Sequence, residues 1–207
     1  MTQDGHLAES GRIMVMGTTI PIKSSDDLSR IKEYYSSVKI KPRNYLLIVF
    51  GMNTALRISD ILNIKWEDIY DSISKRYRDH VSLTEHKTGK ENTVFLNSSV
   101  KNALEKYRTS FIKTPDGYLF KSNKGCNRPI SRQQAYRIIK EAAAYAGYNN
   151  GISCHSLRKT FGYCALKKGI SPAVIMKIYN HSSFRVTQRY LGIDQDEKDE
   201  AYKILNL

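Results

Sequence analysis

Two residues near the C-terminal end have the right types and spacing to hold a phosphate. His155 and Arg158 are three positions apart, a spacing that places two side chains on one face of a helix. His181 and Tyr190 follow within the same stretch, residues 153–193. This combination indicates a tyrosine hydroxyl that is brought to a basic pocket.

A further basic group, Arg57, begins a predicted helix far upstream. Residues 58–64 repeat apolar side chains at helical spacing. An arginine fixed at the start of such a helix can present its planar guanidinium to two oxygens of one phosphate. The alternative is a surface arginine that only starts an amphipathic helix.

Lysines occupy the tip of a predicted hairpin. Residues 85–91 form a polar turn in which Gly89 permits a positive φ. Lys87 and Lys90 lie on this tip and could enter a groove of DNA. The alternative is a hairpin that is only solvated.

Basic residues also gather between positions 121 and 137. A basic loop leads into a predicted helix, Arg132–Tyr145, and helix N-termini are suited to binding backbone phosphates. The alternative for any one of these residues is a solvated charged face. Together with Lys90, the predicted DNA-binding residues are Lys121, Lys124, Arg128, Arg132 and Arg137.

The overall charge of the chain favours a polyanionic partner. Its 207 residues contain 33 Lys and Arg against 20 Asp and Glu, a formal net charge of +13. This charge is larger than a protein needs for a soluble surface. The sequence has no apolar run near the roughly 18 residues that cross a bilayer, and residues 1–13 lack the features of a signal peptide. We therefore expect a soluble, cytoplasmic protein without a membrane partner.

The three cysteines, Cys126, Cys154 and Cys164, are odd in number and form no Cys-x-x-Cys pair. This favours reduced thiols over a disulfide framework or a zinc site. Cys154 lies beside His155, which leaves a Cys–His catalytic or metal pair as an alternative. Adjacent helical residues point about 100° apart, however, which does not suit such a pair.

The pattern of apolar residues predicts a mainly helical fold. Helical periodicity and capping residues indicate helices at 24–38, 42–50, 57–64, 98–112 and 132–145, with further helical runs within 153–193. The second of these is nearly all apolar and should be the buried one. Three short antiparallel strands, at 69–70, 81–83 and 94–96, should form one small sheet.

Three parts of the chain follow from these patterns. Residues 1–23 can bury little and are expected to be a flexible leader or linker remnant. Residues 24–193 form the one well-cored domain. Residues 194–207 form a C-terminal tail helix, because five acids in seven residues suit a first helical turn and an apolar face follows.

Five motifs in a fixed order resemble one known family. They read TALRISDIL at residues 54–62, HKTGK at 86–90, HSLR at 155–158, NHS at 180–182 and TQRYL at 187–191. In order and spacing, this series resembles the catalytic domain of the tyrosine recombinases, the phage integrase family, over residues 26–193. The resemblance implies the helical catalytic domain of that family with a small three-stranded antiparallel β-sheet. It places the active site at Arg57, Lys87, His155, Arg158, His181 and Tyr190.

The chemistry that the resemblance implies suits these residue types. A tyrosine hydroxyl, with an ordinary pKa near 10, is a poor nucleophile until nearby cations stabilise the developing charge. The two arginines would clamp the non-bridging oxygens of the scissile phosphate. His155 would act as general base on Tyr190, Lys87 would protonate the leaving 5′ oxygen, and His181 would hydrogen-bond the phosphate. The 3′-phosphotyrosyl product conserves the bond energy, so neither a metal nor a nucleotide cofactor is needed.

By this resemblance the protein is a site-specific DNA recombinase or integrase, used for integration, excision or inversion of a DNA element. Its partners would be double-stranded DNA and other copies of itself, which in a full-length form would assemble as a tetrameric synapse. It would have no small-molecule substrate. Two alternatives stay open: a non-catalytic DNA-binding regulator that retains the fold, and a type IB topoisomerase-like relaxing activity.

Some positions depart from the pattern of the family. Ala55 stands where the family usually has Gly, Asp60 where it often has Glu, and Tyr179-Asn180 where Leu-Gly frequently precedes the histidine. A positive φ at Ala55 would be strained. The chain is also short for the family, so it is expected to be either an excised catalytic domain or a relative of single-domain members such as fimbrial phase-switch recombinases. Its tail helix would pack either on a neighbouring protomer or back on its own domain.

Overall fold

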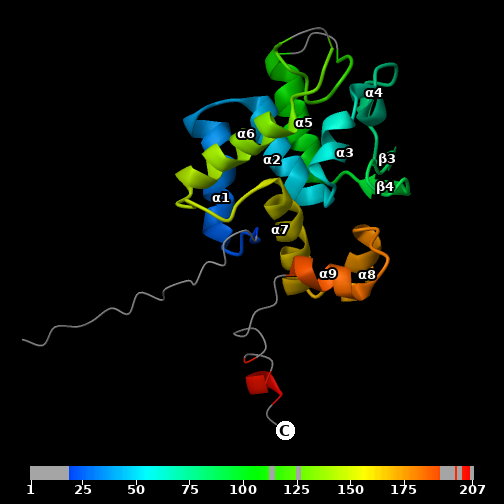
Figure 1. Cartoon of the computed structure of the whole chain (residues 1–207). Coiled ribbons are helices and arrows are strands. Elements are labelled where there is room, and N and C mark those ends of the chain that lie inside the picture. Colours follow the sequence, from blue (N-terminus) through cyan, green and yellow to red (C-terminus); the bar gives the residue numbers. More distant parts are fainter. Residues whose placement is uncertain (1–18, 112–114, 125–126, 192–198, 200–201, 206–207) are drawn as a thin grey trace, which may run out of the picture.

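A computed structural model describes residues 19–111, 115–124, 127–191, 199 and 202–205, without the side chains of 189–191 (Figure 1). The helices are α1 (Ser25–Glu33), the π-helix η1 (Tyr34–Val38), α2 (Pro42–Thr54), α3 (Ile58–Asn63), α4 (Trp66–Ile69), α5 (Ser98–Phe111), α6 (Arg132–Tyr145), α7 (Cys154–Lys167), α8 (Pro172–Ile178) and α9 (Phe184–Leu191). The strands are β1 (Tyr70–Asp71), β2 (Arg76–Tyr77), β3 (His80–Thr84) and β4 (Glu91–Phe95). The predicted mainly helical fold is confirmed. Within the described ranges, none of the helices has the length and apolar character needed to cross a membrane.

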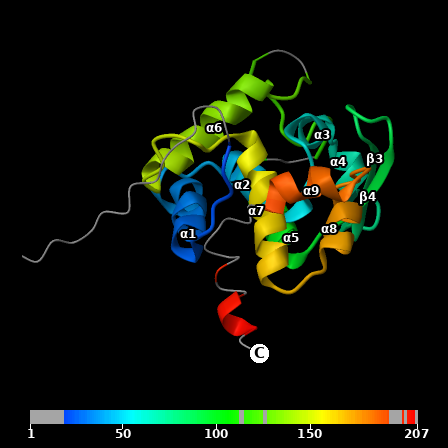
Figure 2. The ribbon, with the colours of Figure 1, turned by 60° about the horizontal axis from the view of Figure 1, so that its bottom comes forward.

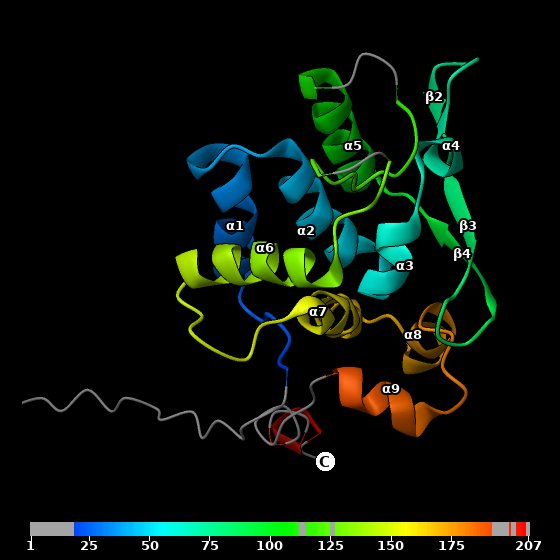
Figure 3. The ribbon, with the colours of Figure 1, turned by 45° about the horizontal axis from the view of Figure 1, so that its top comes forward.

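Helix α2 forms the centre of the core. It starts at Pro42, whose fixed φ suits a first helical turn, and every side chain from Leu46 to Phe50 is buried. Helix α5 packs on one side of α2 and α7 on another (Figure 3). Gly51 allows α7 to approach, because a Cβ atom there would lie 2.6 Å from Cδ1 of Leu157. The second predicted helix is therefore the buried one, as expected.

The strands form two separate antiparallel hairpins, which corrects the prediction of a single three-stranded sheet. β1 pairs with β2 through Tyr70 and Tyr77, and β3 pairs with β4 along the whole length of both strands. The sequence pattern missed β2, because Arg76 and Tyr77 show no apolar alternation. The turn before β2 is held by Asp71, whose Oδ1 accepts a hydrogen bond from the Ile73 N–H at 2.9 Å.

Helices α7, α8 and α9 gather beside the main core (Figures 1 and 2). Tyr179, at the end of α8, is fully buried in a small cluster with Ala55, Ala165 and Ile175. Gly162 of α7 makes room for it, since a Cβ atom there would collide with the Tyr179 hydroxyl. Helix α7 therefore connects this cluster with α2 in the main core.

The described start of the chain packs on α7. Ile22 is 0% exposed, and its N–H donates to Oγ1 of Thr160 at 2.9 Å. The N–H of Ile20 donates to the carbonyl of Gly151 at 2.9 Å. Residues 19–23 thus belong to the folded body, so the end of the predicted leader is placed too late; its residues 1–18 lie outside the described part.

Most of the predicted tail helix, 194–207, also lies outside the described residues. Residues 202–204 are helical where they are described. Tyr202, Ile204 and Leu205 are all exposed.

Two residues, at positions where the family that the sequence resembles often has glycine, adopt a glycine-like backbone. Ala55 ends α2 in the left-handed region, with a φ of 57°. Asn180 has a φ of 55°, and asparagine tolerates this region better than alanine does. The conformation at Ala55 turns the chain from α2 into α3, and the Ala55 carbonyl accepts a hydrogen bond from Arg158.

We predict that Ala55→Gly changes the free energy of unfolding by less than about 1 kcal/mol. Relief of the left-handed strain offsets the lost methyl group and the added chain entropy. The matched control is Ala165→Gly in α7, which is also buried but helical, and should lower this free energy by about 2 kcal/mol. Denaturant unfolding measures both values. Equal losses at the two positions would contradict strain at Ala55.

Candidate active site

A cavity of about 670 Å³ opens between α3, the β3–β4 hairpin, α7 and α9. Arg158 lies in the wall behind it, where its Nη2 is 3.4 Å from Nε2 of His181. Tyr190 continues α9, but its side chain lies outside the described residues. Four of the six predicted catalytic residues line the cavity: Arg57, Lys87, His155 and His181.

Arg158 is 2% exposed, and backbone carbonyl groups hold its guanidinium. Its Nη1 donates to the carbonyl of Ala55, and its Nη2 donates to the carbonyl of Tyr179 at 2.8 Å. Both carbonyls belong to C-terminal caps, of α2 and of α8, where the helix dipole is negative. Two helix ends therefore stabilise this buried charge.

Tyr179 contacts both Arg158 and His181. The Cζ of Arg158 lies 4.5 Å from the centroid of the Tyr179 ring, a cation–π contact. The Tyr179 hydroxyl donates to the carbonyl of Arg158 at 2.7 Å. The ring of His181 packs beside it at a centroid distance of 5.0 Å. Tyr179, at a position where the family that the sequence resembles frequently has leucine, thus adds contacts that orient both Arg158 and His181.

His181 is a neutral histidine at neutral pH. Its Nδ1 lies 3.1 Å from Oγ1 of the buried Thr187, while its Nε2 faces Arg158. Because a guanidinium can only donate, Nε2 accepts and Nδ1 carries the proton. Burial, followed by the positive charges of Arg158 and Arg57, lowers the pKa of His181 to about 4, although Glu85 opposes this shift.

His155 lies at the start of α7, on the cavity wall. Ser153 caps the helix, and its hydroxyl accepts a hydrogen bond from the His155 N–H at 3.2 Å. Desolvation and then the charge of Arg158, with smaller contributions from Lys159 and further arginines, lower the pKa of His155 below its ordinary value. His155 is therefore mainly unprotonated at pH 7, the form that can accept a proton.

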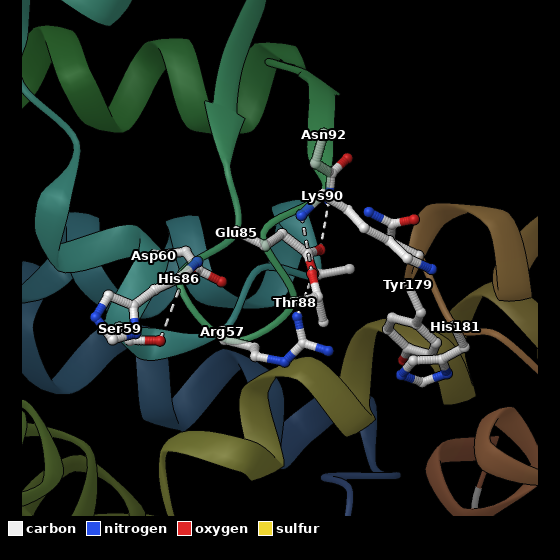
Figure 4. A network of polar contacts seen from close by, with 12 residues as sticks. Arg57, Ser59, Asp60, Glu85, His86, Thr88, Lys90, Asn92, Tyr179 and His181 are labelled. Atoms are coloured by element: carbon white, nitrogen blue, oxygen red, sulfur yellow. Dashed lines mark hydrogen bonds and ion pairs between the residues drawn. The ribbon is translucent and has the colours of Figure 1, made fainter.

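Arg57 is the N-cap residue of α3, and its side chain forms an ion pair with a buried acid (Figure 4). Nη1 of Arg57 lies 2.6 Å from Oε2 of Glu85, whose side chain is 0% exposed. Thr88 and Asn92 also donate to the Glu85 carboxylate, at 2.7 and 3.0 Å. Burial raises the pKa of Glu85, but these hydrogen bonds and the Arg57 charge outweigh it and keep the net pKa below its ordinary value. Glu85 is therefore ionised.

Glu85 is the residue of this site that the sequence pattern missed. It was predicted only as part of a polar turn. A signal was nevertheless present, because Val81 and Leu83 face inward along β3 and the same alternation continues to Glu85.

Lys87 lies in the turn between β3 and β4, as predicted. The turn is closed by the N–H of Gly89, which donates to the carbonyl of Glu85 at 2.8 Å, and Gly89 has a φ of 65°. The buried Asp60 of α3 accepts a hydrogen bond from the His86 N–H at 3.0 Å. The tip that carries Lys87 is thus attached to the helix that Arg57 begins.

The predicted DNA-binding residues divide by position. Arg132 lines the cavity beside the catalytic candidates. Lys121 is partly buried, and its Nζ lies 3.6 Å from Oδ1 of Asp116. The others are exposed: Lys90, Lys124, Arg128 and Arg137.

Cys154 does not provide a reactive thiolate. Burial, opposed by the charge of Arg132, raises the pKa of the Cys154 thiol to about 11, so the thiol stays protonated at neutral pH. Among the residues that the structure describes, no three His, Cys, Asp or Glu side chains come together as metal ligands would. Cys126 lies outside the described residues.

Comparison with known proteins identifies the family of this chain. The family model described as "Phage integrase family" matches residues 24–197. A probable integrase/recombinase of Bacillus subtilis (strain 168), YoeC, is 41% identical over 184 residues, which cover 89% of this chain and 95% of the relative. A tyrosine recombinase of Pseudothermotoga lettingae is 32% identical over 164 residues, which cover 79% of this chain and 54% of the relative.

The fold is also found among solved structures. The crystal structure of XerA recombinase matches with a TM-score of 0.72 and 24% sequence identity, covering 94% of this chain and 66% of that one. The chain thus spans nearly all of the Bacillus relative but about half of the Pseudothermotoga protein. Since the family model covers most of its length, the chain belongs to the phage integrase family.

Proposed function

We propose that this protein is a site-specific DNA recombinase, in which Tyr190 attacks a phosphodiester and forms a 3′-phosphotyrosyl intermediate. The observation that carries the proposal is the cavity in which Arg57, Lys87, His155 and His181 meet beside the buried Arg158. The names of its relatives, an integrase/recombinase and a tyrosine recombinase, support this activity.

The arginines supply the electrostatic part of the mechanism. Arg158 is held by two carbonyls and Arg57 by Glu85, so both guanidinium groups are oriented in the DNA-free protein. A scissile phosphate in the cavity would place its non-bridging oxygens against them. Donors that are already in place stabilise the charge of a pentacoordinate transition state without reorganisation.

Protons move in opposite directions on the two sides of the phosphorus. His155, unprotonated at neutral pH, accepts the proton of the Tyr190 hydroxyl as the new oxygen–phosphorus bond forms. Lys87 donates a proton to the 5′ oxygen as the old bond breaks. Rejoining is the reverse: a 5′-hydroxyl attacks the phosphotyrosine, and the tyrosine oxygen leaves and recovers its proton. The chain's own residues thus account for every proton transfer.

The assembly is part of the same proposal. Double-stranded DNA, bound in the cytoplasm, would lie over the cavity and the basic residues around it. Residues 24–193 would form the catalytic domain, and the exposed apolar residues of the tail, Tyr202, Ile204 and Leu205, would pack on a neighbouring copy on the DNA. A second copy would cover apolar area that is otherwise exposed to water.

We predict that the protein forms a covalent adduct with a nicked suicide DNA substrate and that Tyr190→Phe forms none. The reason is that phenylalanine lacks the attacking oxygen. Denaturing gel electrophoresis measures the adduct. The matched control, Tyr145→Phe, removes the hydroxyl of an exposed residue at the end of α6, away from the residues that line the cavity, and should react as the wild type does. DNA binding without any adduct would instead support a non-catalytic regulator.

We predict that the rate of adduct formation, measured at DNA concentrations far below saturation so that it reports the ionisations of the DNA-free protein, is nearly constant from about pH 8 to 7 and falls on further acidification. In the DNA-free protein the pKa of His155 lies below its ordinary value, so its basic form predominates at neutral pH and is lost as the pH falls through that lowered pKa. His181 stays neutral down to about pH 4. In His155→Gln the rate should be lower, with little change over the same acidic range. A wild-type rate that increases on acidification would contradict a histidine base.

The association constant for duplex DNA should fall as the salt concentration rises. We predict that Arg132→Ala makes the slope of the log–log plot about 1 less steep, because one phosphate contact is lost. Fluorescence anisotropy over a salt series measures the slope. Arg76→Ala, which removes an exposed arginine from the β1–β2 hairpin, should leave it unchanged. Equal changes in both variants would indicate a general charge effect instead of a contact at the cavity.

A further inference from the structure

Glu85 is a buried acid at a site that binds an anion in the proposed function. Its side chain is 0% exposed, and its carboxylate receives donors from three elements: Arg57 at the start of α3, Thr88 in the hairpin turn and Asn92 in β4. A negative charge beside a phosphate-binding arginine weakens the attraction for the phosphate. Such an acid needs an explanation other than substrate affinity.

The geometry around Glu85 provides one. Only Nη1 of Arg57 is bonded to Glu85, and 13% of the Arg57 side chain remains exposed. Arg57 also lines the cavity, so it reaches the substrate while one corner of its guanidinium is fixed. An arginine side chain that is fixed in advance loses less rotamer entropy when it meets a phosphate.

Glu85 also connects Arg57 with the turn that carries Lys87. The backbone of Glu85 closes the turn that carries Lys87, through hydrogen bonds to Gly89 and Lys90 at 2.8 and 2.9 Å. Its side chain holds Arg57 (Figure 4). Any displacement of the turn would therefore move the arginine with it.

We propose that Glu85 is a positioning residue, which orients Arg57 toward the scissile phosphate and keeps it in register with the turn that carries Lys87. This proposal rests on the proposed recombinase function. It assigns to Glu85 a gain in cleavage rate at the expense of DNA affinity. A purely structural role would instead weaken folding without a selective effect on the phosphate clamp, the pair of arginines Arg57 and Arg158 that would hold the phosphate.

The experiment measures single-turnover cleavage of a nicked suicide substrate by wild type, Glu85→Ala, Glu85→Gln, Arg57→Ala and the Arg57→Ala/Glu85→Ala double variant. Glu85→Ala should cleave roughly 10- to 100-fold more slowly, as expected for a misplaced catalytic group, while binding DNA at least as tightly as wild type. Glu85→Gln, which can still accept the Arg57 hydrogen bond, should recover much of the rate. The double variant should be no slower than Arg57→Ala alone, because Glu85 acts through Arg57.

A second substrate separates Arg57 from Lys87. In a 5′-bridging phosphorothiolate the leaving group is a thiolate, which needs no proton from Lys87. Glu85→Ala should remain slow on this substrate if its defect lies in the clamp. Full recovery there would overturn the assignment to Arg57, as would a wild-type rate for Glu85→Ala or strictly multiplicative effects in the double variant.

A matched control separates positioning from stability. Glu141 also accepts two hydrogen bonds, from Tyr35 and Lys39, and lies on α6 outside the residues that line the cavity. Glu141→Ala should lower the melting temperature without the cleavage defect. If Glu85→Ala and Glu141→Ala lost rate in the same proportion to their stability, the positioning role would be overturned.

One measurement does not depend on cleavage. In ¹⁵N-labelled, DNA-free protein, the guanidinium of Arg57 should rotate slowly and give resolved Nη signals, which Glu85→Ala should average and Glu85→Gln should preserve. Freely averaged signals in wild type would overturn the positioning of Arg57. If wild type formed no adduct on either substrate, the recombinase function would fail, and this measurement would still decide whether Glu85 fixes Arg57.

Discussion

The burial of the Arg158 guanidinium is the constraint on which the site depends. A buried charge is tolerated only when hydrogen bonds and dipoles replace water, and Arg158 is the largest of the fully buried side chains described. Its two carbonyl partners dictate the backbone around them. Helix α2 has to end at Ala55 in a left-handed turn, and α8 has to end at Tyr179. The turn into α3 then places Arg57 two residues after the first partner.

The two arginines of the clamp are fixed in different ways. Arg158 is held by helix ends and an aromatic face, and Arg57 by an ionised acid on a hairpin. Each arrangement orients a guanidinium before DNA arrives, so little ordering remains to oppose binding. The two arginines differ electrostatically, because the negative charge of Glu85 partly offsets the positive charge of Arg57.

The sequence could predict the parts of this site that depend on side-chain type and spacing. His155, Arg158 and the buried second helix follow from periodicity, and Gly89 marks the hairpin turn. The sequence could not predict which carbonyl groups bind Arg158. Every residue has a backbone carbonyl, and only the path of the folded chain decides which of them lie near the guanidinium. The three-stranded sheet was wrong for a related reason: β1 finds its partner across a short polar turn, and no apolar alternation marks that pairing. The packing of Ile22 on α7 was missed because two isoleucines, Ile20 and Ile22, are too few to establish a period in this short segment.

The electrostatics of the cavity link the phosphate clamp to the proton transfers. Desolvation and the arginine charges both disfavour imidazolium, so His155 and His181 have lowered pKa values in the DNA-free protein. A histidine with a lowered pKa is a weaker base. A phosphate docked against Arg57 and Arg158 adds negative charge beside these rings, which favours their protonated forms and opposes the shift. In the proposed mechanism, His155 therefore gains basicity when the scissile phosphate is bound, and the unoccupied site is poorly able to deprotonate the tyrosine.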